Sequence, residues 1–375
     1  MLPAPFPSSG VAVLASGTTS VSGTVSLAPW NGQVVRLSFS GTDSRGQITD
    51  VVRNIIVEGS THLTDLISAV GSAADYRAGR LLYNDLTSQP RILALRSADG
   101  TEEAIPLDPG TIPDSGFVSS TGAIYIADTP GFVRIYEWRN GTRTFLGNTT
   151  DPRAPLSVNG DFAAFPLIGA AGTELHRRDL VSGTDIIVAT GASTKSNSVA
   201  FNGDVAFSRD DDHDIYWYHN GTVIRLTADD DNVVWNSSPI TDGTSVVFAR
   251  TPPGGGSVSI LRSDGNVLDE LARGALNYAA NGGWTAFTRP DAGKIIQVWL
   301  RAPDGSQRQV SQFGTLSFIN AVGDDGSVVF TNGSKRYYGP PSGNPIEIGS
   351  AQGTVFWRDG AYVLLLGRSA FRISP

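Results

Sequence analysis

The sequence predicts an all-β protein whose main part is a β-propeller of eight blades, with seven blades as the alternative. Three observations lead to this prediction: a repeat with a period near 40 residues, four short strand-like runs in each repeat, and almost no helical periodicity. Four-stranded sheets at this period, apolar on both faces, are typical of propellers, because each sheet packs between two neighbours. We expect an N-terminal segment over residues 1–59 and the propeller over residues 60–375.

Each repeat contains one strand-like run that ends near a large apolar anchor, as in GDVAFSR (203–209) and GTSVVFAR (243–250). Successive anchors are 42, 40, 42, 41, 39, 43 and 34 residues apart. They are Tyr83, Tyr125, Phe165, Phe207, Phe248, Phe287, Phe330 and Leu364. Around each anchor, short β-rich runs are separated by Asn-Gly or Asp-Gly, the residues that tolerate the positive φ of tight hairpins. This spacing predicts one blade per anchor.

The two ends of the repeat region complement each other. The last repeat has three strand-like runs and then stops, whereas HLTDLISAV (62–70) precedes the first anchor and has no blade of its own. Pairing this early strand with the last three would close the ring and remove an exposed sheet edge.

The stretch DIYWYHNGTVIRLTADDD (214–231), followed by SSPITDGTSVVFAR (237–250), resembles the repeat of TolB-type propellers. The shared features are a strand, a turn, Leu-Thr, an acidic linker, Pro, and an Asp-Gly strand that ends in Phe. The resemblance covers blades four to six well and the others loosely. It implies the fold, but not a function, because such propellers serve unrelated roles.

Residues 22–59 contain three alternating runs with turns at Asn31-Gly32 and Asp43 to Gly46. The pattern resembles the later strands of bacterial immunoglobulin-like domains, on the residues Leu27, Gly32, Val35, Asp43 and Gly46. Such modules beside a propeller imply a large secreted or surface-exposed bacterial protein, so we expect an extracellular, cell-surface or periplasmic location.

Composition excludes several function classes. The net charge of −8 and the absence of a basic stripe argue against nucleic acid as a partner. There is no cysteine, hence no disulfide or thiolate site, and no apolar run is long enough to span a membrane. MLPAPFPSSG lacks the features of a signal peptide. Met1 is interpreted as a start added to a piece of a longer chain, with a genuine short start as the alternative.

The stretch FSRDDDHDIYWYHNGTVIRLTADDD (207–231) is the most acidic. Asp210, Asp212 and Asp214 have the D-x-D-x-D spacing of calcium loops, but Ile215 stands where such a loop needs Gly and Gly221 where it needs Glu. A solvated loop with local turns is the favoured interpretation, and calcium the alternative. We expect no other cofactor.

Phe-x-Arg ends three successive blade strands, at Arg209, Arg250 and Arg289. Three guanidinium groups at the mouth of neighbouring blades could hold a carboxylate or sulfate. The simpler hypothesis pairs each arginine with a nearby aspartate. The candidates for that pairing are Asp210, Asp242 and Asp291.

Trp235, in the linker between blades four and five, and the run Arg336 to Tyr338 are candidates for exposed stacking on a ligand. His213 lies among carboxylates and is a candidate binding or acid-base group. There is no Gly-x-Ser-x-Gly elbow and no phosphate-binding loop.

These patterns favour a non-catalytic propeller module of a larger exported bacterial protein, monomeric or part of that chain, which recognises a protein or a glycan through its loop face. Two alternatives stay open: a polysaccharide-lyase-like enzyme that acts on an acidic glycan, and an architectural spacer.

Overall fold

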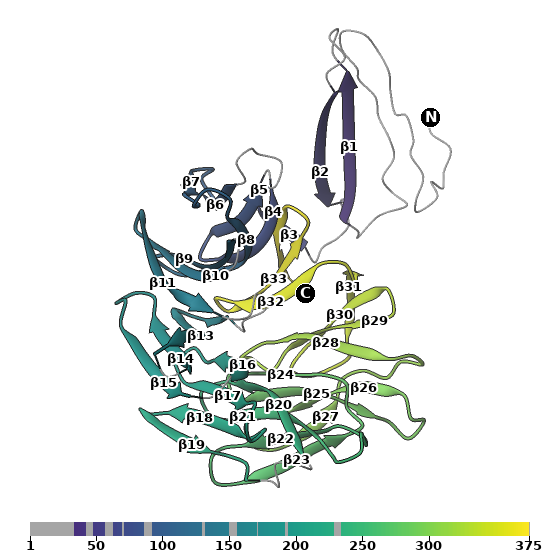
Figure 1. The fold of residues 1–375 in the computed structure, drawn as a ribbon. Helices are drawn as coiled ribbons and strands as arrows, with labels where there is room; N and C mark the ends of the chain where they lie inside the picture. Colours follow the sequence, from purple (N-terminus) through teal and green to yellow (C-terminus); the bar gives the residue numbers. More distant parts are fainter. Residues whose placement is uncertain are drawn as a thin grey trace, which may run out of the picture.

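The computed structural model describes residues 34–42, 48–56, 63–69, 71–85, 92–129, 132–149, 156–170, 172–191, 194–228 and 234–374. Across these residues the chain forms strands and no helix, in eight four-stranded sheets and one hairpin. The sheets follow one another around a ring, as the colour gradient in Figure 1 shows. The prediction of an all-β, eight-bladed propeller is confirmed.

Blades one to four each use four consecutive strands. Blade one consists of β4 (Ser72–Arg77), β5 (Arg80–Asp85), β6 (Ile92–Ser97) and β7 (Glu102–Ile105). Blade two consists of β8 (Ile112–Val118), β9 (Gly122–Thr129), β10 (Phe132–Arg139) and β11 (Thr142–Thr149). Blade three consists of β12 (Ser157–Asn159), β13 (Phe162–Gly169), β14 (Gly172–Asp179) and β15 (Asp185–Thr190). Blade four consists of β16 (Thr194–Val199), β17 (Val205–Arg209), β18 (Ile215–His219) and β19 (Thr222–Arg225).

Blades five to seven repeat this order, and blade eight combines both ends of the repeat region. Blade five consists of β20 (Trp235–Thr241), β21 (Val246–Thr251), β22 (Ser259–Ser263) and β23 (Leu268–Arg273). Blade six consists of β24 (Tyr278–Asn281), β25 (Trp284–Pro290), β26 (Ile296–Arg301) and β27 (Gln307–Gln309). Blade seven consists of β28 (Ser317–Val322), β29 (Val328–Asn332), β30 (Lys335–Gly339) and β31 (Ile346–Ser350). Blade eight consists of β32 (Thr354–Arg358), β33 (Ala361–Leu366), β34 (Ser369–Ile373) and β3 (Leu63–Ser68).

The ring closes as the sequence predicts. Strand β3 pairs antiparallel with β34, from Leu63 opposite Ile373 to Ser68 opposite Ser369. It therefore supplies the fourth strand of blade eight, which the end of the chain lacks. Ile67 packs in the same buried cluster as Leu81 of blade one, so the early strand also seals the seam between the last and first blades.

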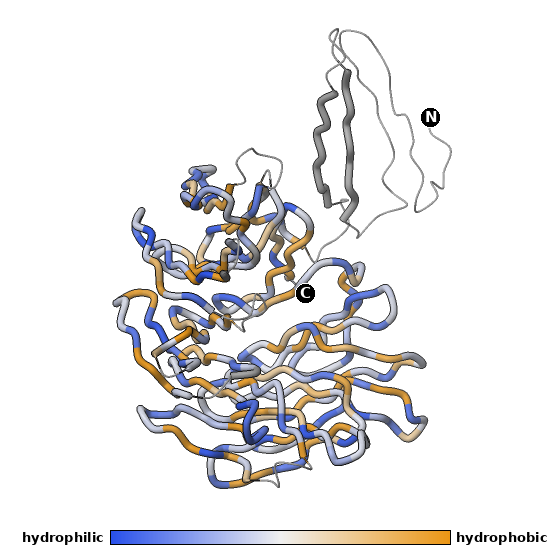
Figure 2. The backbone as a smooth tube through the Cα atoms, in the orientation of Figure 1, coloured by the Kyte–Doolittle hydropathy of each residue, from blue (hydrophilic) through white to orange (hydrophobic). Residues whose placement is uncertain are grey.

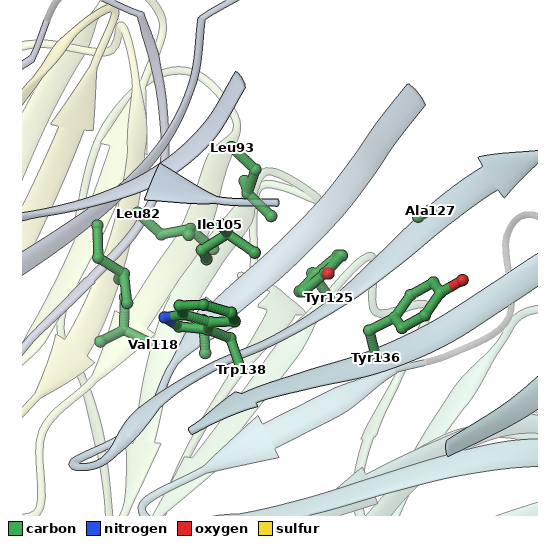
Figure 3. Close-up of a cluster of buried hydrophobic side chains, with 10 residues drawn as sticks. Leu82, Leu93, Ile105, Val118, Tyr125, Ala127, Tyr136 and Trp138 are labelled. Carbon is green, nitrogen blue, oxygen red and sulfur yellow. The ribbon is translucent and has the colours of Figure 1, made fainter. Parts of the chain in front are cut away.

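The core lies between the blades. All eight anchors fall on the second strands, and each is at most 3% exposed. In Figure 3, for example, Leu82 and Ile105 of blade one meet Tyr125 and Trp138 of blade two. Apolar segments follow the strands in Figure 2, while many connections are hydrophilic. Burial on both sheet faces explains why these strands show no alternation of apolar and polar residues.

The first strand of each blade forms one edge of its sheet, and it lies innermost, because first strands of most neighbouring blades contact one another, such as β16 with β20 and β24 with β28. Their inner edges expose backbone groups that need partners. A polar side chain of one blade repeatedly binds the backbone amide of the next blade's first strand. These bonds join Asp75 to Val118 (2.8 Å), Ser157 to Val199 (3.0 Å), Ser198 to Thr241 (2.9 Å) and Asn277 to Ile319 (3.3 Å).

The described part of residues 1–59 is one antiparallel hairpin, β1 (Val34–Thr42) paired with β2 (Ile48–Ile56). These strands match two of the three predicted runs, and the first run lies outside the described residues. The immunoglobulin-like segment and the domain boundary near residue 59 stay predictions. Among the described residues, no helix is long and apolar enough to cross a membrane.

Candidate binding site on the loop face

The chain reverses at every strand of a blade. The loops between second and third strands, and the linkers between blades, therefore emerge on one side of the disc, which we call the loop face. Most of the residues singled out from the sequence lie there, at the junction of blades four and five. The opposite side carries the tight hairpins, such as Asn220-Gly221, whose φ angles are 50° and 80°.

The three aspartates with calcium-like spacing have different partners. Asp214 is fully buried and accepts hydrogen bonds from Thr227 Oγ1 (2.6 Å) and Arg225 Nε (2.6 Å). Asp212 accepts from the Tyr216 hydroxyl, and Asp210 is exposed. In the described part of the chain, no group of three His, Cys, Asp or Glu side chains is arranged to hold a metal ion. The calcium interpretation is untested and stays a prediction.

The three arginines lie at the ends of β17, β21 and β25, but each contacts its own blade. Arg209 makes two hydrogen bonds to Asp211, with Nε 2.9 Å from Oδ1. Arg250 Nε donates to Asn236 Oδ1 at 3.1 Å. The guanidinium of Arg289 lies 3.6 Å from the centroid of the Trp299 ring.

Two of the three aspartates expected to pair with these arginines are engaged elsewhere. Asp242 lies in the turn before β21, at the opposite end from Arg250, and accepts the amide of Gly283 in the next blade at 2.9 Å. Asp291 accepts the amide of Ile295 within its own loop, also at 2.9 Å. The arginines of the three Phe-x-Arg strand ends therefore have different partners.

His213 and Trp235 are brought together. Their ring centroids lie 5.2 Å apart, and the amide of Asn236 donates to the His213 carbonyl at 3.2 Å. Trp235 is 55% exposed at the start of β20, and His213 has a φ of 53° in the acidic loop. A side chain from a loop and one from the next innermost strand thus form one exposed aromatic corner.

A polar network under this corner was not anticipated from the sequence. Thr227 accepts the amide of Ile215 (3.0 Å) and donates to Asp214, and Asn236 Nδ2 contacts the same hydroxyl at 3.4 Å. With Arg250 on Asn236, the network connects blades four and five. The only sequence signal was the Leu-Thr pair after β19, which the repeat pattern contains.

An arc of exposed apolar side chains runs from this corner across blades five, six and seven. Its members lie at or just before the starts of three successive innermost strands, and we call them the apolar arc. They are Trp235 (55% exposed), Leu276 (54%), Leu316 (47%) and Phe318 (41%). Sequence analysis identified only Trp235, because the others stand at different offsets from their strands.

The backbone beneath the apolar arc is tied across the three blades. The Tyr278 hydroxyl donates to the Ser238 carbonyl of blade five. Asn277 Nδ2 donates to the Ile319 carbonyl of blade seven at 2.8 Å, and the Leu276 amide donates to Thr288 Oγ1 at 2.8 Å. The exposed side chains therefore project from a rigid frame.

The run from Arg336 to Tyr338 does not form an exposed platform, contrary to the sequence-based suggestion. Arg336 is buried, and its Nη2 donates to the carbonyls of Ala351, Gln352 and Gly353. Burial lowers its pKa to about 10. Tyr337 packs between Phe313 and Phe330.

No protein-family model matches the chain, and no curated protein matches it in sequence. Solved propeller structures are similar at low identity. Dipeptidyl peptidase 4 of Porphyromonas gingivalis is 11% identical, with 81% of this chain and 57% of that chain covered and a TM-score of 0.54. The likeness is one of fold alone.

Two further solved structures have lower TM-scores and support no argument about function. TolB from Acinetobacter baumannii is 16% identical, with 75% of this chain and 81% of that chain covered and a TM-score of 0.36. An oligogalacturonate lyase from Vibrio parahaemolyticus is 10% identical, with 92% and 97% covered and a TM-score of 0.41.

Proposed function

We infer that this protein is a non-catalytic binding module of a larger exported bacterial protein, and that it recognises a protein or a glycan through its loop face. The observation that supports this most is the apolar arc. Large apolar side chains that gather on one surface of a folded protein commonly mark an interaction site. Here they project from or just before innermost strands whose backbone is tied across three blades by hydrogen bonds.

The surrounding polar groups support recognition rather than catalysis. Arg209 is engaged by Asp211, and Asp214 by Thr227 and Arg225. A general acid or base needs a titratable group that points at a bound substrate. His213 instead lies against Trp235, where its ring forms part of the aromatic corner.

The alternative function is a polysaccharide-lyase-like enzyme that acts on an acidic glycan. The observation that favours it is the environment of Arg289. Among the described residues, its guanidinium contacts the Trp299 ring and no carboxylate. A lyase needs such a cation to neutralise the uronate, together with a base. An architectural spacer, the third hypothesis, would need neither.

The experiment measures retention of the 375-residue chain on arrays of glycans and peptides, with turnover followed in parallel. We expect wild type to be retained and the double variant Trp235→Ala, Phe318→Ser to lose retention. The control is Ile346→Ser, on the outer strand β31, whose side chain is 43% exposed and so resembles Phe318. Equal retention of wild type and the double variant would contradict the binding site, and unsaturated products that absorb in the ultraviolet would establish the lyase instead.

A further inference from the structure

Arg289 holds a positive charge that is uncompensated within the described residues. Its guanidinium lies over Trp299, and the carboxylate closest to it in the sequence, that of Asp291, is engaged elsewhere. Asp291 caps its own loop, whereas Glu270 of the neighbouring blade binds Arg273 through Nε (3.1 Å) and Nη2 (3.2 Å). The Arg289 side chain is half-buried, so part of it remains accessible to a ligand.

The position of this guanidinium suits a carboxylate ligand. Stacking on the indole fixes the plane of the guanidinium and leaves its edge N–H groups directed away from the ring. Those N–H groups form the fork that matches a carboxylate in two hydrogen bonds. A stacked arginine is thus preorganised, and little side-chain entropy is lost when an anion binds.

Arg289 is adjacent to the apolar arc. Its chain neighbour Thr288 accepts the amides of both Leu276 (2.8 Å) and Asn277 (3.0 Å). Trp299 packs against the same buried cluster as Tyr278, the residue that ties blade six to blade five. The cation and the exposed apolar side chains therefore share one backbone frame.

The chemistry of the apolar arc distinguishes between partner classes. Leu276, Leu316 and Phe318 offer no hydrogen-bonding group, and sugar hydroxyls need polar partners beside an aromatic platform. Large apolar side chains of a protein segment need only apolar surface. An apolar surface with one fixed cation at its edge therefore complements a segment that carries both apolar and acidic residues.

We propose that the apolar arc and Arg289 together bind a protein segment rich in large apolar and acidic side chains. Apolar side chains of that segment cover Trp235, Leu276 and Phe318, and a carboxylate pairs with the Arg289 guanidinium. This inference rests on the proposed binding function and deepens it by naming the class of partner.

The test uses four fluorescent probes against the 375-residue chain: synthetic peptide pools that are acidic and apolar, basic and apolar, or acidic and polar, and an oligouronate. Fluorescence anisotropy gives each Kd. We expect the acidic, apolar pool to bind most tightly. Arg289→Gln should weaken it about tenfold, because the glutamine amide keeps one neutral donor of the fork and loses one charge-assisted hydrogen bond. The same variant should not weaken the basic, apolar pool, and added salt should reduce the difference.

Two control variants separate the site from general surface effects. Arg372→Gln removes an exposed arginine of β34, and Ile346→Ser removes an apolar side chain as exposed as Phe318. Neither should change the Kd, whereas Leu276→Ser and Phe318→Ser should each raise it severalfold. Thermal melts establish that every variant is folded.

Each alternative outcome overturns the proposal in a recognisable way. Equal affinity for the acidic and basic apolar pools, or an Arg289→Gln variant that binds like wild type, would refute the role of the cation. Preference for the oligouronate over all peptides would refute the partner class while the proposed binding function stands. Absence of binding to all four probes would refute both.

Discussion

Asp75 and Arg358 face each other across the seam between the first and last blades, with Arg358 Nε 3.7 Å from Asp75 Oδ1. A second ion pair crosses the same seam with the arginine in the first blade and the aspartate in the last. Here Arg77 Nε lies 3.4 Å from Asp359 Oδ1. Arg77 also reaches Asp161 of blade three, at 2.8 Å. Burial raises the pKa of Asp75, while Arg358 and the Val118 amide oppose that rise. Ion pairs thus reinforce a seam that no covalent bond closes.

Arg77→Ala should destabilise the ring by about 2 kcal/mol or more. Its side chain is 9% exposed, and its loss removes a donor from the Gly160 carbonyl and leaves the Asp161 carboxylate with the Ser120 amide but without its cation. Urea unfolding provides the measurement. Lys335→Ala, which breaks an exposed pair with Glu347, is the control and should scarcely change the midpoint. Similar losses in both variants would show that the seam pair is no stronger than a surface pair.

Removal of β3 should open the propeller. A chain that starts at residue 71 lacks the partner of β34, whose backbone edge would then be exposed, and lacks Ile67 from the seam cluster. We expect a lower melting temperature and aggregation on size-exclusion chromatography. A chain that starts at residue 60 retains β3 and should melt like the full-length protein. If the two truncated chains melted alike, closure by β3 would not matter for stability.

The repeat anchors should contribute far more than the exposed aromatic residues of the same type. Phe248 is fully buried and Phe318 is 41% exposed. Phe248→Ala should cost about 3–5 kcal/mol through the cavity it leaves, and Phe318→Ala much less. Chemical denaturation of both variants checks this. A comparable cost for the two would mean that the second strands are not the core.

Much of the fold could be predicted because the repeat is local. Each anchor such as Phe207 stands at a fixed distance from its turns, and the missing strand of the last blade pointed to the segment that contains Ile67. The bonds between blades could not be predicted. Ser157 binds the Val199 amide, and Arg77 binds Asp161 two blades away, so both depend on how the ring places distant residues.

The candidate site was predicted only in part, for a related reason. The repeat and the two-residue period of β-strands place three arginines at strand ends. The partner of each arginine, however, is set by a single nearby side chain, which is Asp211 for Arg209 and Trp299 for Arg289. Leu276 and Phe318 showed no pattern, because one precedes its strand and the other lies within it. The exposure of these side chains depends on how neighbouring blades are arranged around the ring, which the local sequence does not reveal.

His176 should make stability depend on pH. Burial lowers its pKa, but the hydrogen bond to Asp185 and the Glu174 carboxylate, 3.4 Å from Nε2, outweigh this, and the net pKa is raised above 6.5. The charged imidazolium therefore stabilises the folded state below the unfolded pKa, and that contribution disappears as pH rises through the higher folded pKa. The difference in unfolding free energy between wild type and His176→Gln should be larger at pH 5 than at pH 8. A difference that grows toward pH 8 would contradict the assignment.

Arg336 should hold the linker between blades seven and eight. Its Nη2 donates to the carbonyls of Ala351 (3.1 Å), Gln352 (2.9 Å) and Gly353 (3.1 Å), just before β32 begins. Arg336→Met fills the space but leaves these acceptors unpaired, at a cost of about 1–3 kcal/mol. Arg336→Lys keeps the charge, but its ammonium lacks the planar geometry that directs Nη2 at the three carbonyls, and should rescue only part of the loss. Hydrogen exchange of the β32 amides should quicken in the order wild type, lysine, methionine. A lysine variant as protected as wild type would show that an ammonium satisfies the three carbonyls as well as Nη2 does, and that the planar guanidinium is not needed.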